Sequence, residues 1–301
     1  HPHSTGPRMV GFGIIGCADI AQKIVRTLAQ VEGCEVVAVA SRNIAKAEEF
    51  CASLDLPASS CARYGNYADL LADARVQVVY LPLPTAFHKE WAPKVAAAGK
   101  HLLVEKPVGV TTSEVEEMVA ACAANKVQFM DGVMWMHHVR APKMREVVQS
   151  GELGKVTRVT SSFHFCGGDE FDEGNIRVKK ECDPLGCVGD LGWYQIRAVL
   201  YLLQDLPSRA SAYAHKRSRD GVITSCSATL FFASGVFATF DCGFDTNLRM
   251  EVAVSGSKAT LSCSDFVLNK SVGESSYSVG TLEFQEGYGP EGHGLRSTAE
   301  E

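Results

Sequence analysis

The sequence predicts a two-domain α/β fold, in which a doubly wound parallel sheet is followed by an α+β domain built on an antiparallel sheet. Three observations predict it. Short apolar runs alternate with helical stretches from residue 10 to about residue 132. A turn led by Gly16 follows the first apolar run. From about residue 133 the pattern changes to strands with few helices.

In the first domain, residues 9–132, the apolar runs are continuous rather than alternating, which is typical of strands buried on both faces of a sheet. Because helical stretches separate them, the strands are expected to be parallel and joined by right-handed crossovers. Ser113 and Glu116 form a capping-box pattern where the last helix begins. We expect strands at 10–15, 35–40, 76–82, 101–105 and 127–130, and helices at 19–30, 44–54, 87–98 and 113–125.

The second domain, residues 133–268, opens with a helix that Gly151 ends. Its strands follow one another with few helices between them, which predicts an antiparallel sheet with helices on one face. Residues 269–301 are polar and glycine-rich, and we expect a tail or an incomplete C-terminal part there. We expect helices at 141–150 and 190–203, and strands at 156–165, 209–215, 222–232, 236–244, 250–255 and 259–263.

The bulk composition excludes some classes of protein. The chain has 301 residues, 46% of them hydrophobic, and a net charge of -6 from 29 basic and 35 acidic residues. These charges form no basic stripe, so we expect no nucleic-acid partner. No apolar stretch approaches the roughly 20 residues that a membrane helix needs, so we expect no membrane partner.

The eleven cysteines include no Cys-x-x-Cys pair, and most of them lie inside apolar runs. Cysteine behaves there as a small hydrophobic residue. The close pair Cys182 and Cys187 lacks histidine or cysteine companions at metal-ligand spacing, so we expect no metal site. A reducing compartment, the cytoplasm, is the expected setting.

A turn of the dinucleotide-binding type follows the first predicted strand. It reads Gly16-Cys-Ala-Asp-Ile-Ala21, which is G-x-G-x-x-G with alanine at the second and third glycine positions. The glycine permits a tight turn, and the small residues let the backbone approach a pyrophosphate at the helix N-terminus. A plain strand-turn-helix would also fit, but the repeating β/α pattern favours the cofactor. The expected contacts are Gly16, Cys17, Ala18, Asp19 and Ile20.

The second predicted strand ends at Ser41 and Arg42, where an NAD site would usually have an acidic residue. An arginine suits a phosphate because its planar fork binds two oxygens, and Lys46 could add charge one turn later. We therefore expect NADP(H) rather than NAD(H). The alternative is a solvated arginine at a helix start.

Further polar groups follow the next predicted strands, at the sheet edge where open α/β folds bind ligands. Thr85 could also be a helix N-cap, His88 a surface residue and Lys106 an ordinary exposed lysine. The expected cofactor contacts at this edge are Leu83, Pro84, Thr85, His88, Glu105 and Lys106.

Asp190 and Tyr194 lie four residues apart where a helix is predicted to begin, so they share a helix face. A lysine near a tyrosine, beside a nicotinamide, is a proton-transfer pair for alcohol and carbonyl chemistry. The alternatives are an N-cap aspartate and a core tyrosine.

Four stretches carry a family resemblance. Together they resemble the glucose-fructose oxidoreductase/inositol dehydrogenase/MocA (Gfo/Idh/MocA) family over about residues 10–268. Within it the chain is most similar to plant oxidoreductases and, more distantly, to dimeric dihydrodiol dehydrogenases and NADP-dependent D-xylose dehydrogenases. The stretches are Gly13-Ile-Ile-Gly16-Cys-Ala-Asp-Ile-Ala21, Leu83-Pro-Thr-Ala-Phe-His88, Glu105-Lys-Pro107 and Asp190-Leu-Gly-Trp-Tyr194.

The resemblance implies a Rossmann domain and a C-terminal domain with a large open antiparallel sheet that often pairs two subunits, so we expect a homodimer. It implies that Lys106 is catalytic, and that Tyr194 stands where many members have histidine, as in the dihydrodiol dehydrogenase branch. Met134-Trp-Met-His-His138 with Arg140 resembles the segment that lines the substrate pocket. Core packing is an equal alternative for Trp135. The residues expected at the substrate are Trp135, His138, Arg140, Asp190 and Tyr194.

We therefore expect an NADP(H)-dependent oxidoreductase that acts on a secondary alcohol or carbonyl of a sugar or cyclic diol. In it Tyr194 exchanges the hydroxyl proton, Lys106 supplies a positive charge, and Asp190 orients the substrate or the lysine. The alternative is a catalytically silent regulator that binds a dinucleotide. NADPH binding without turnover would favour that alternative.

Overall fold

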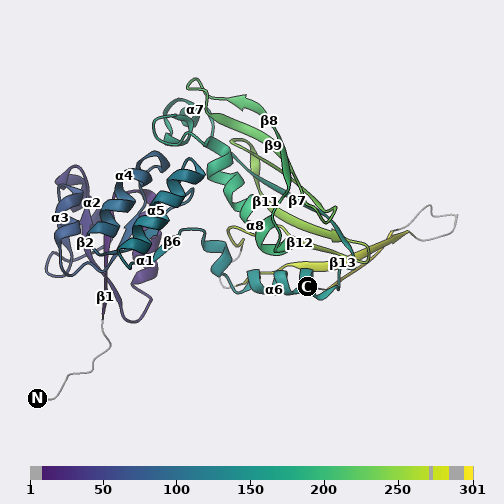
Figure 1. The fold of residues 1–301 in the computed structure, drawn as a ribbon, viewed down its shortest axis with the longest axis horizontal. Helices are drawn as coiled ribbons and strands as arrows, with labels where there is room; N and C mark the ends of the chain where they lie inside the picture. Colours follow the sequence, from purple (N-terminus) through teal and green to yellow (C-terminus); the bar gives the residue numbers. More distant parts are fainter. Residues whose placement is uncertain (1–8, 271–273, 285–294, 301) are drawn as a thin grey trace, which may run out of the picture. The chain divides into compact units, whose positions relative to one another are not determined.

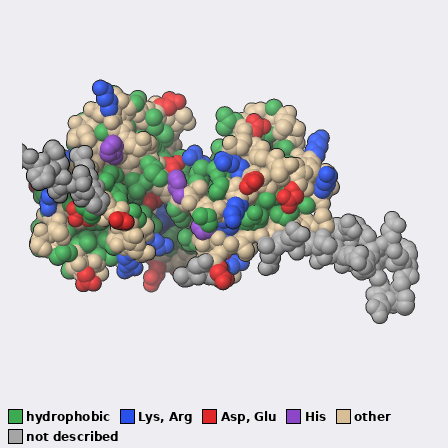
Figure 2. Space-filling view, turned by 90° about the horizontal axis from the view of Figure 1, so that it is seen from below, with side chains coloured by type: hydrophobic (Ala, Val, Ile, Leu, Met, Phe, Trp, Pro, Cys, Tyr) green, Lys and Arg blue, Asp and Glu red, His purple; other side chains and the backbone are tan. Residues whose placement is uncertain are grey.

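The computed structural model describes residues 9–270, 274–284 and 295–300. Of these, the residues up to Gly132 form one compact unit and those from Val133 on form a second (Figure 1). No helix in these described ranges has both the length and the apolar character that a membrane-spanning helix needs. On the face that Figure 2 shows, acidic and basic side chains are interspersed, without a continuous basic stripe.

The first unit is a parallel six-stranded sheet in the order β3-β2-β1-β4-β5-β6, with helices between its strands, which confirms the predicted Rossmann fold. Chain order reverses between β1 and β4, so their carboxyl ends meet at the switch point where such folds bind ligands. The strands are β1 Val10–Ile15, β2 Cys34–Ala40, β3 Ala62–Tyr64, β4 Val78–Leu81, β5 His101–Val104 and β6 Phe129–Asp131. The helices are α1 Asp19–Leu28, α2 Ile44–Ser53, α3 Tyr67–Ala72, α4 His88–Ala97 and α5 Thr112–Ala124, with a 3-10 turn η1 Thr85–Phe87.

Burial explains why the central strands read as continuous apolar runs. Val36 to Ala40 are buried in succession, so both faces of β2 are covered. On one face Ile14 packs with Val25 of α1 and Phe50 of α2. Of the strands and α-helices of this unit, β3 and α3 were not predicted, because they are only three and six residues long.

The N-cap of α5 lies two residues before the predicted one. Its N-cap is Thr111, whose Oγ1 accepts a 3.3 Å hydrogen bond from the Glu114 backbone N–H. Glu114 Oε2 in turn accepts from the Val110 N–H at 3.0 Å. The residues that cap this helix are therefore Thr111 and Glu114 rather than Ser113 and Glu116, and the Glu114 carboxylate accepts from the residue before the N-cap.

The second unit is an eight-stranded, mostly antiparallel sheet in the order β14-β13-β12-β11-β7-β10-β9-β8. Among its described pairs of neighbouring strands, only β7 and β10 are parallel. Helices α6 and α8 lie along one face of it (Figure 1) and bury Val159, Phe240 and Val254 there. The strands are β7 Val156–Cys166, β8 Arg209–Arg217, β9 Ile223–Phe231, β10 Phe237–Gly243, β11 Asp245–Gly256, β12 Thr260–Cys263, β13 Ser278–Phe284 and β14 Leu295–Glu300. The helices are α6 Arg140–Ser150, α7 Asp169–Gly174 and α8 Trp193–Leu203, with 3-10 turns η2 Met134–His137 and η3 Ile176–Val178 and a π-helical turn η4 Val188–Gly192.

Two predictions about this unit were wrong. The described parts of 269–301 are not a tail, because β13 pairs with β12 and β14 pairs with β13. Tyr277 and Val279 pack against the core, so a polar sequence is held by backbone pairing and a few apolar contacts. The helix predicted at 190–203 begins instead as η4, so Asp190 lies inside a π-helical turn and is not an N-cap.

Candidate active site

The turn after β1 has the backbone that a dinucleotide site needs. Gly16 has φ +105°, a conformation that strains other residues, and a Cβ there would lie 2.8 Å from Leu83 Cδ2. Helix α1 follows, and its N-cap Ala18 has no side chain that caps the first N–H groups. These N–H groups point to where an anion binds at a helix N-terminus, so the turn through Ile20 fits a pyrophosphate.

Two cations follow β2: Arg42, which hydrogen-bonds Tyr67, and Lys46 of α2, which acts on Cys17 of the turn. Ser41 is buried, and Arg42 and Lys46 are exposed. Burial raises the pKa of Cys17 to about 11, while Lys46 and a hydrogen bond with Ser41 act the other way. Cys17, Ser41 and Lys46 therefore lie together, and this corner fits a phosphate on the cofactor ribose.

The loop after β4 is held by contacts of the buried His88 ring. Its η1 turn has Pro84 at the N-cap, so Thr85, which is buried, is not the cap. His88 is fully buried: Nε2 lies 2.8 Å from the Leu83 carbonyl oxygen and Nδ1 2.9 Å from that of Val108. The ring is thus neither a surface residue nor open to a cofactor, and it links the loop after β4 to the loop after β5. Burial lowers the pKa of His88, against the two carbonyl contacts.

Lys106 sits in a loop that Glu105 anchors. Glu105 Oε1 accepts a 2.6 Å hydrogen bond from the Tyr80 hydroxyl, and Oε2 accepts a 3.1 Å bond from the Lys106 backbone N–H. Lys106 is half-buried and precedes a cis bond to Pro107. Its backbone is therefore held at the carboxyl end of β5. The Glu105 carboxylate bonds to protein groups, Tyr80 and the Lys106 backbone, so Glu105 supports Lys106.

Asp190 and Tyr194 are both buried in the second unit, with the Tyr194 ring 5.9 Å from that of Phe163. Arg177 Nε lies 2.8 Å from Asp190 Oδ2. Burial alone would lower the pKa of Arg177, but Asp190, Asp183 and Tyr194 raise it above its usual value. Asp190 therefore contacts this guanidinium directly, and Tyr194 acts on its charge. No spacing in the sequence pointed to Arg177, because only the folded chain brings it into contact with Asp190.

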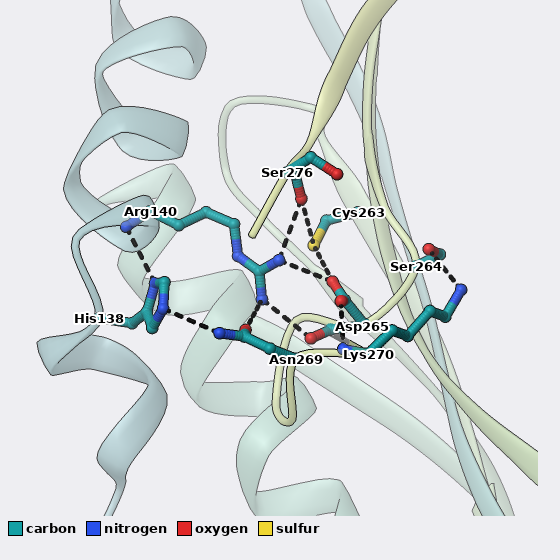
Figure 3. A network of polar contacts seen from close by, with 8 residues as sticks. All are labelled: His138, Arg140, Cys263, Ser264, Asp265, Asn269, Lys270 and Ser276. Atoms are coloured by element: carbon teal, nitrogen blue, oxygen red, sulfur yellow. Dashed lines mark hydrogen bonds and ion pairs between the residues drawn. The ribbon is translucent and has the colours of Figure 1, made fainter. Parts of the chain in front are cut away.

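Arg140 does not have the environment expected of a substrate residue. Its buried guanidinium bonds to Asp265 through Oδ1 at 2.6 Å and through the carbonyl oxygen at 2.9 Å (Figure 3). It also bonds to the Ser276 carbonyl at 3.0 Å and to Asn269 Oδ1 at 3.1 Å. Arg140 thus ties α6 to the segment after β12 through contacts within the protein.

His138 and Trp135, the two other residues expected at the substrate in this part of the chain, also make contacts within the second unit. His138 Nδ1 accepts a 3.1 Å bond from the Arg140 N–H, and Nε2 lies 3.1 Å from Asn269 Nδ2 (Figure 3). Trp135 is buried, edge-on to Tyr201 at 5.5 Å and to Phe266 at 5.8 Å. Core packing, the alternative left open by the sequence, accounts for Trp135.

Among the described residues, no group of three or more His, Cys, Asp or Glu side chains is arranged to hold a metal ion. The arrangement that remains is a nucleotide turn, a strand-end lysine, and a buried aspartate–tyrosine pair in a separate sheet unit. These features define a two-domain dinucleotide-binding oxidoreductase. The chain belongs to the GFO/IDH/MocA family: residues 10–133 match its "Oxidoreductase family, NAD-binding Rossmann fold" and residues 142–262 its "GFO/IDH/MocA C-terminal domain".

Named relatives cover most of the chain. A D-xylose 1-dehydrogenase (NADP(+)) from Haloferax volcanii is 35% identical over 78% of this chain and 70% of its own length. A dTDP-3,4-didehydro-2,6-dideoxy-alpha-D-glucose 3-reductase from Saccharopolyspora spinosa is 32% identical over 84% and 74%. The trans-1,2-dihydrobenzene-1,2-diol dehydrogenase of Mus musculus is 31% identical over 82% and 72%. The chain is thus an oxidoreductase related to enzymes of sugars and diols, while its nearness to plant members stays a prediction.

The fold has a solved counterpart. The crystal structure of a 3-ketoreductase from Actinomadura kijaniata, in complex with NADP and TDP-benzene, superposes with a TM-score of 0.82 at 24% identity. The match covers 97% of this chain and 84% of that one. Both units therefore have the fold of that reductase.

Proposed function

We propose that this oxidoreductase uses NADP(H) to interconvert a secondary alcohol and a carbonyl on a sugar or a cyclic diol. The observation that carries the proposal is the set of reacting groups: Lys106, anchored at the end of β5, and Tyr194, buried beside Asp190. The relatives that share this family act, by their names, on sugars and on a dihydrodiol.

The residues at the ends of β1 and β2 support NADP(H). The N–H groups of the turn through Ile20 would hold the pyrophosphate, and Arg42 and Lys46, beside Ser41, would hold a ribose phosphate. The loop of Leu83 to Thr85 and Lys106 would meet the nicotinamide end. When bound, the cofactor supplies or accepts a hydride at the nicotinamide ring.

The chain's own residues would handle the proton. The Tyr194 hydroxyl would give a proton to the substrate oxygen during reduction and take it back during oxidation. The Lys106 ammonium would favour the negative charge that develops on these oxygens, and Asp190 would orient the groups. A positioned acid/base of this kind contributes roughly 10²–10⁴-fold in rate.

We also propose a homodimer that forms through the open face of the eight-stranded sheet. Small polar side chains such as Thr160, Thr239 and Ser262 line a hollow of about 460 Å³ on this sheet. Tyr213, on edge strand β8, is 68% exposed. Light scattering at micromolar concentration should report twice the chain's 32.4 kDa mass, and a clean monomer would count against the dimer.

A cytoplasmic location is part of the same proposal. All eleven cysteines are free thiols, which is typical of a reducing compartment. Fractionation of the native host cell, with immunodetection of the chain, would test this.

A panel of sugars and cyclic diols tests the activity. The chain is mixed with NADP⁺ or NADPH and each panel member, and the absorbance of the reduced nicotinamide is followed. Turnover that is lost in Lys106→Met and Tyr194→Phe supports the proposal. NADPH binding without turnover on any panel member would favour a silent regulator instead.

A further inference from the structure

The ion pair between Arg177 and Asp190 is built into the second unit. Arg177 Nε lies 2.8 Å from Asp190 Oδ2, and the Asp190 side chain is only 7% exposed against 37% for Arg177. A charge-assisted bond to a carboxylate is stronger when that carboxylate is shielded from water. This pair therefore differs from a surface salt bridge between two mobile side chains.

The backbone that carries Arg177 is anchored on both sides. Asn175 Oδ1 accepts a 3.0 Å hydrogen bond from the Arg177 N–H. The carbonyl oxygen of Val178, a buried residue, accepts a 2.8 Å bond from the Ser218 hydroxyl. Arg177 therefore lies in a short turn, η3, that is hydrogen-bonded to Ser218 at the end of β8, so the fold sets the position of its backbone.

Asp190 contacts this guanidinium, and two further acidic groups, Asp183 and Tyr194, act on its charge. Asp190 from η4, Asp183 from the loop before it and Tyr194 from α8 all favour its charged form. Interaction free energies are reciprocal, so the guanidinium favours the anionic form of each of them to the same extent. For Tyr194 that anionic form is the state in which it has given up its proton.

We infer that Arg177 is a positioning residue of the active site, which holds Asp190 in place and stabilises negative charge on the Tyr194 oxygen. The inference deepens the proposed function and rests on Tyr194 as the proton-transfer group. Arg177 is a cation that belongs to the same unit as Tyr194. A residue that only neutralised buried Asp190 would leave the ionisation of Tyr194 unchanged, and this separates the two roles.

The test measures the ionisation of Tyr194 without any substrate. The ultraviolet absorbance of each full-length variant is titrated with base and compared with the same variant carrying Tyr194→Phe, so the difference reports Tyr194 alone. The variants are Arg177→Met, Arg177→Lys and Asp190→Asn. Lys180→Met, an exposed residue of the same segment, is the matched control.

Arg177→Met should raise the Tyr194 midpoint by about one pH unit or more, because a cation close to the hydroxyl is lost. Arg177→Lys should raise it less, and Lys180→Met not at all. Asp190→Asn should lower it, because a negative charge is removed while Arg177 stays, and this variant remains informative if Arg177→Met does not fold. The pH profile of turnover should move in the same directions.

An unchanged Tyr194 midpoint in a folded Arg177→Met would overturn the inference. If that variant does not fold, an unchanged midpoint in Arg177→Lys would overturn it. The outcome is separable from that of the proposed function. Shifted midpoints with no turnover on any substrate would leave the Arg177 inference standing and reject the oxidoreductase chemistry. Turnover with unshifted midpoints would do the reverse.

Discussion

The Tyr80 hydroxyl donates a 2.6 Å hydrogen bond to Glu105 Oε1, and the other oxygen of that carboxylate accepts from the Lys106 N–H. A buried strand residue thus fixes the backbone of the proposed catalytic lysine through one carboxylate. The pair explains why Glu105 is useful at this position although its carboxyl group is directed to the protein.

Tyr80→Phe tests this support. It removes one hydrogen bond to a carboxylate, which is worth about 1.5–3 kcal/mol, and should lower the melting temperature. Turnover should also fall several-fold while NADPH affinity changes little, because the lysine loses a constraint. Tyr64→Phe, which removes a 3.0 Å bond to Asp73 Oδ2 in the same unit, is the control and should lower stability alone. Equal turnover in both variants would show that the Glu105 link does not act on Lys106.

Arg42→Ala should weaken NADPH binding by roughly ten- to a hundredfold, because a charge-assisted phosphate contact is worth about 1.5–3 kcal/mol. NADH binding should change little, since that cofactor lacks the phosphate. Fluorescence titration with both cofactors measures the two effects, and Arg26→Ala, an exposed arginine of α1, is the control. Equal losses for both cofactors, or a native preference for NADH, would contradict the assignment.

His88 predicts a pH dependence of stability. Burial lowers its pKa in the folded chain below the usual value of about 6.5 in the unfolded chain. The unfolded state therefore binds more protons below about pH 6.5, so the His88 contribution is fully present above that pH and is lost as the pH falls. The melting temperature of the wild type should drop more steeply from pH 7 to pH 5 than that of His88→Asn. His137→Asn, at an exposed histidine, should follow the wild type, and parallel curves for all three would refute the prediction.

Arg140 should matter for stability and not for substrate binding. Its removal leaves the buried Asp265 carboxylate without its cation, which costs about 3–5 kcal/mol. Urea unfolding of Arg140→Met should show this loss, whereas Lys143→Met, at an exposed position of α6, should show none. The KM for the substrate should stay within about twofold of the wild type, because the Arg140 guanidinium bonds to Asp265 and is not needed for substrate binding. A large rise in KM with unchanged stability would show that Arg140 binds the substrate, as the sequence predicted.

Much of the fold could be predicted because it rests on local patterns. The apolar runs of β1 and β2 are visible in the sequence because strands buried on both faces need apolar residues at successive positions. The turn at Gly16 is visible because its positive φ favours glycine. Strands β13 and β14 leave none, because they are held by pairing with distant strands. A polar segment that completes a sheet edge looks like a tail when it is read alone.

The site shows the same division. Lys106 and Tyr194 were proposed from motif and order, which are properties of the sequence. The burial of His88 and Arg140 was not predicted, because the sequence does not tell whether a polar side chain is buried among polar groups of the protein or open to solvent. Arg177 was missed because its ion pair with Asp190 depends on tertiary packing alone.

The most direct test of the central claim is the steady-state turnover of Tyr194→Phe, measured beside cofactor titration by fluorescence. The account predicts that turnover falls by about 10²–10⁴-fold, because the acid/base is lost. NADPH affinity should stay nearly unchanged, because the ring still packs beside Phe163. Deuterated substrate would show that the hydride step limits the rate. If Tyr194→Phe then keeps more than about half of the wild-type turnover, the proton is transferred by another group and the proposed mechanism is wrong.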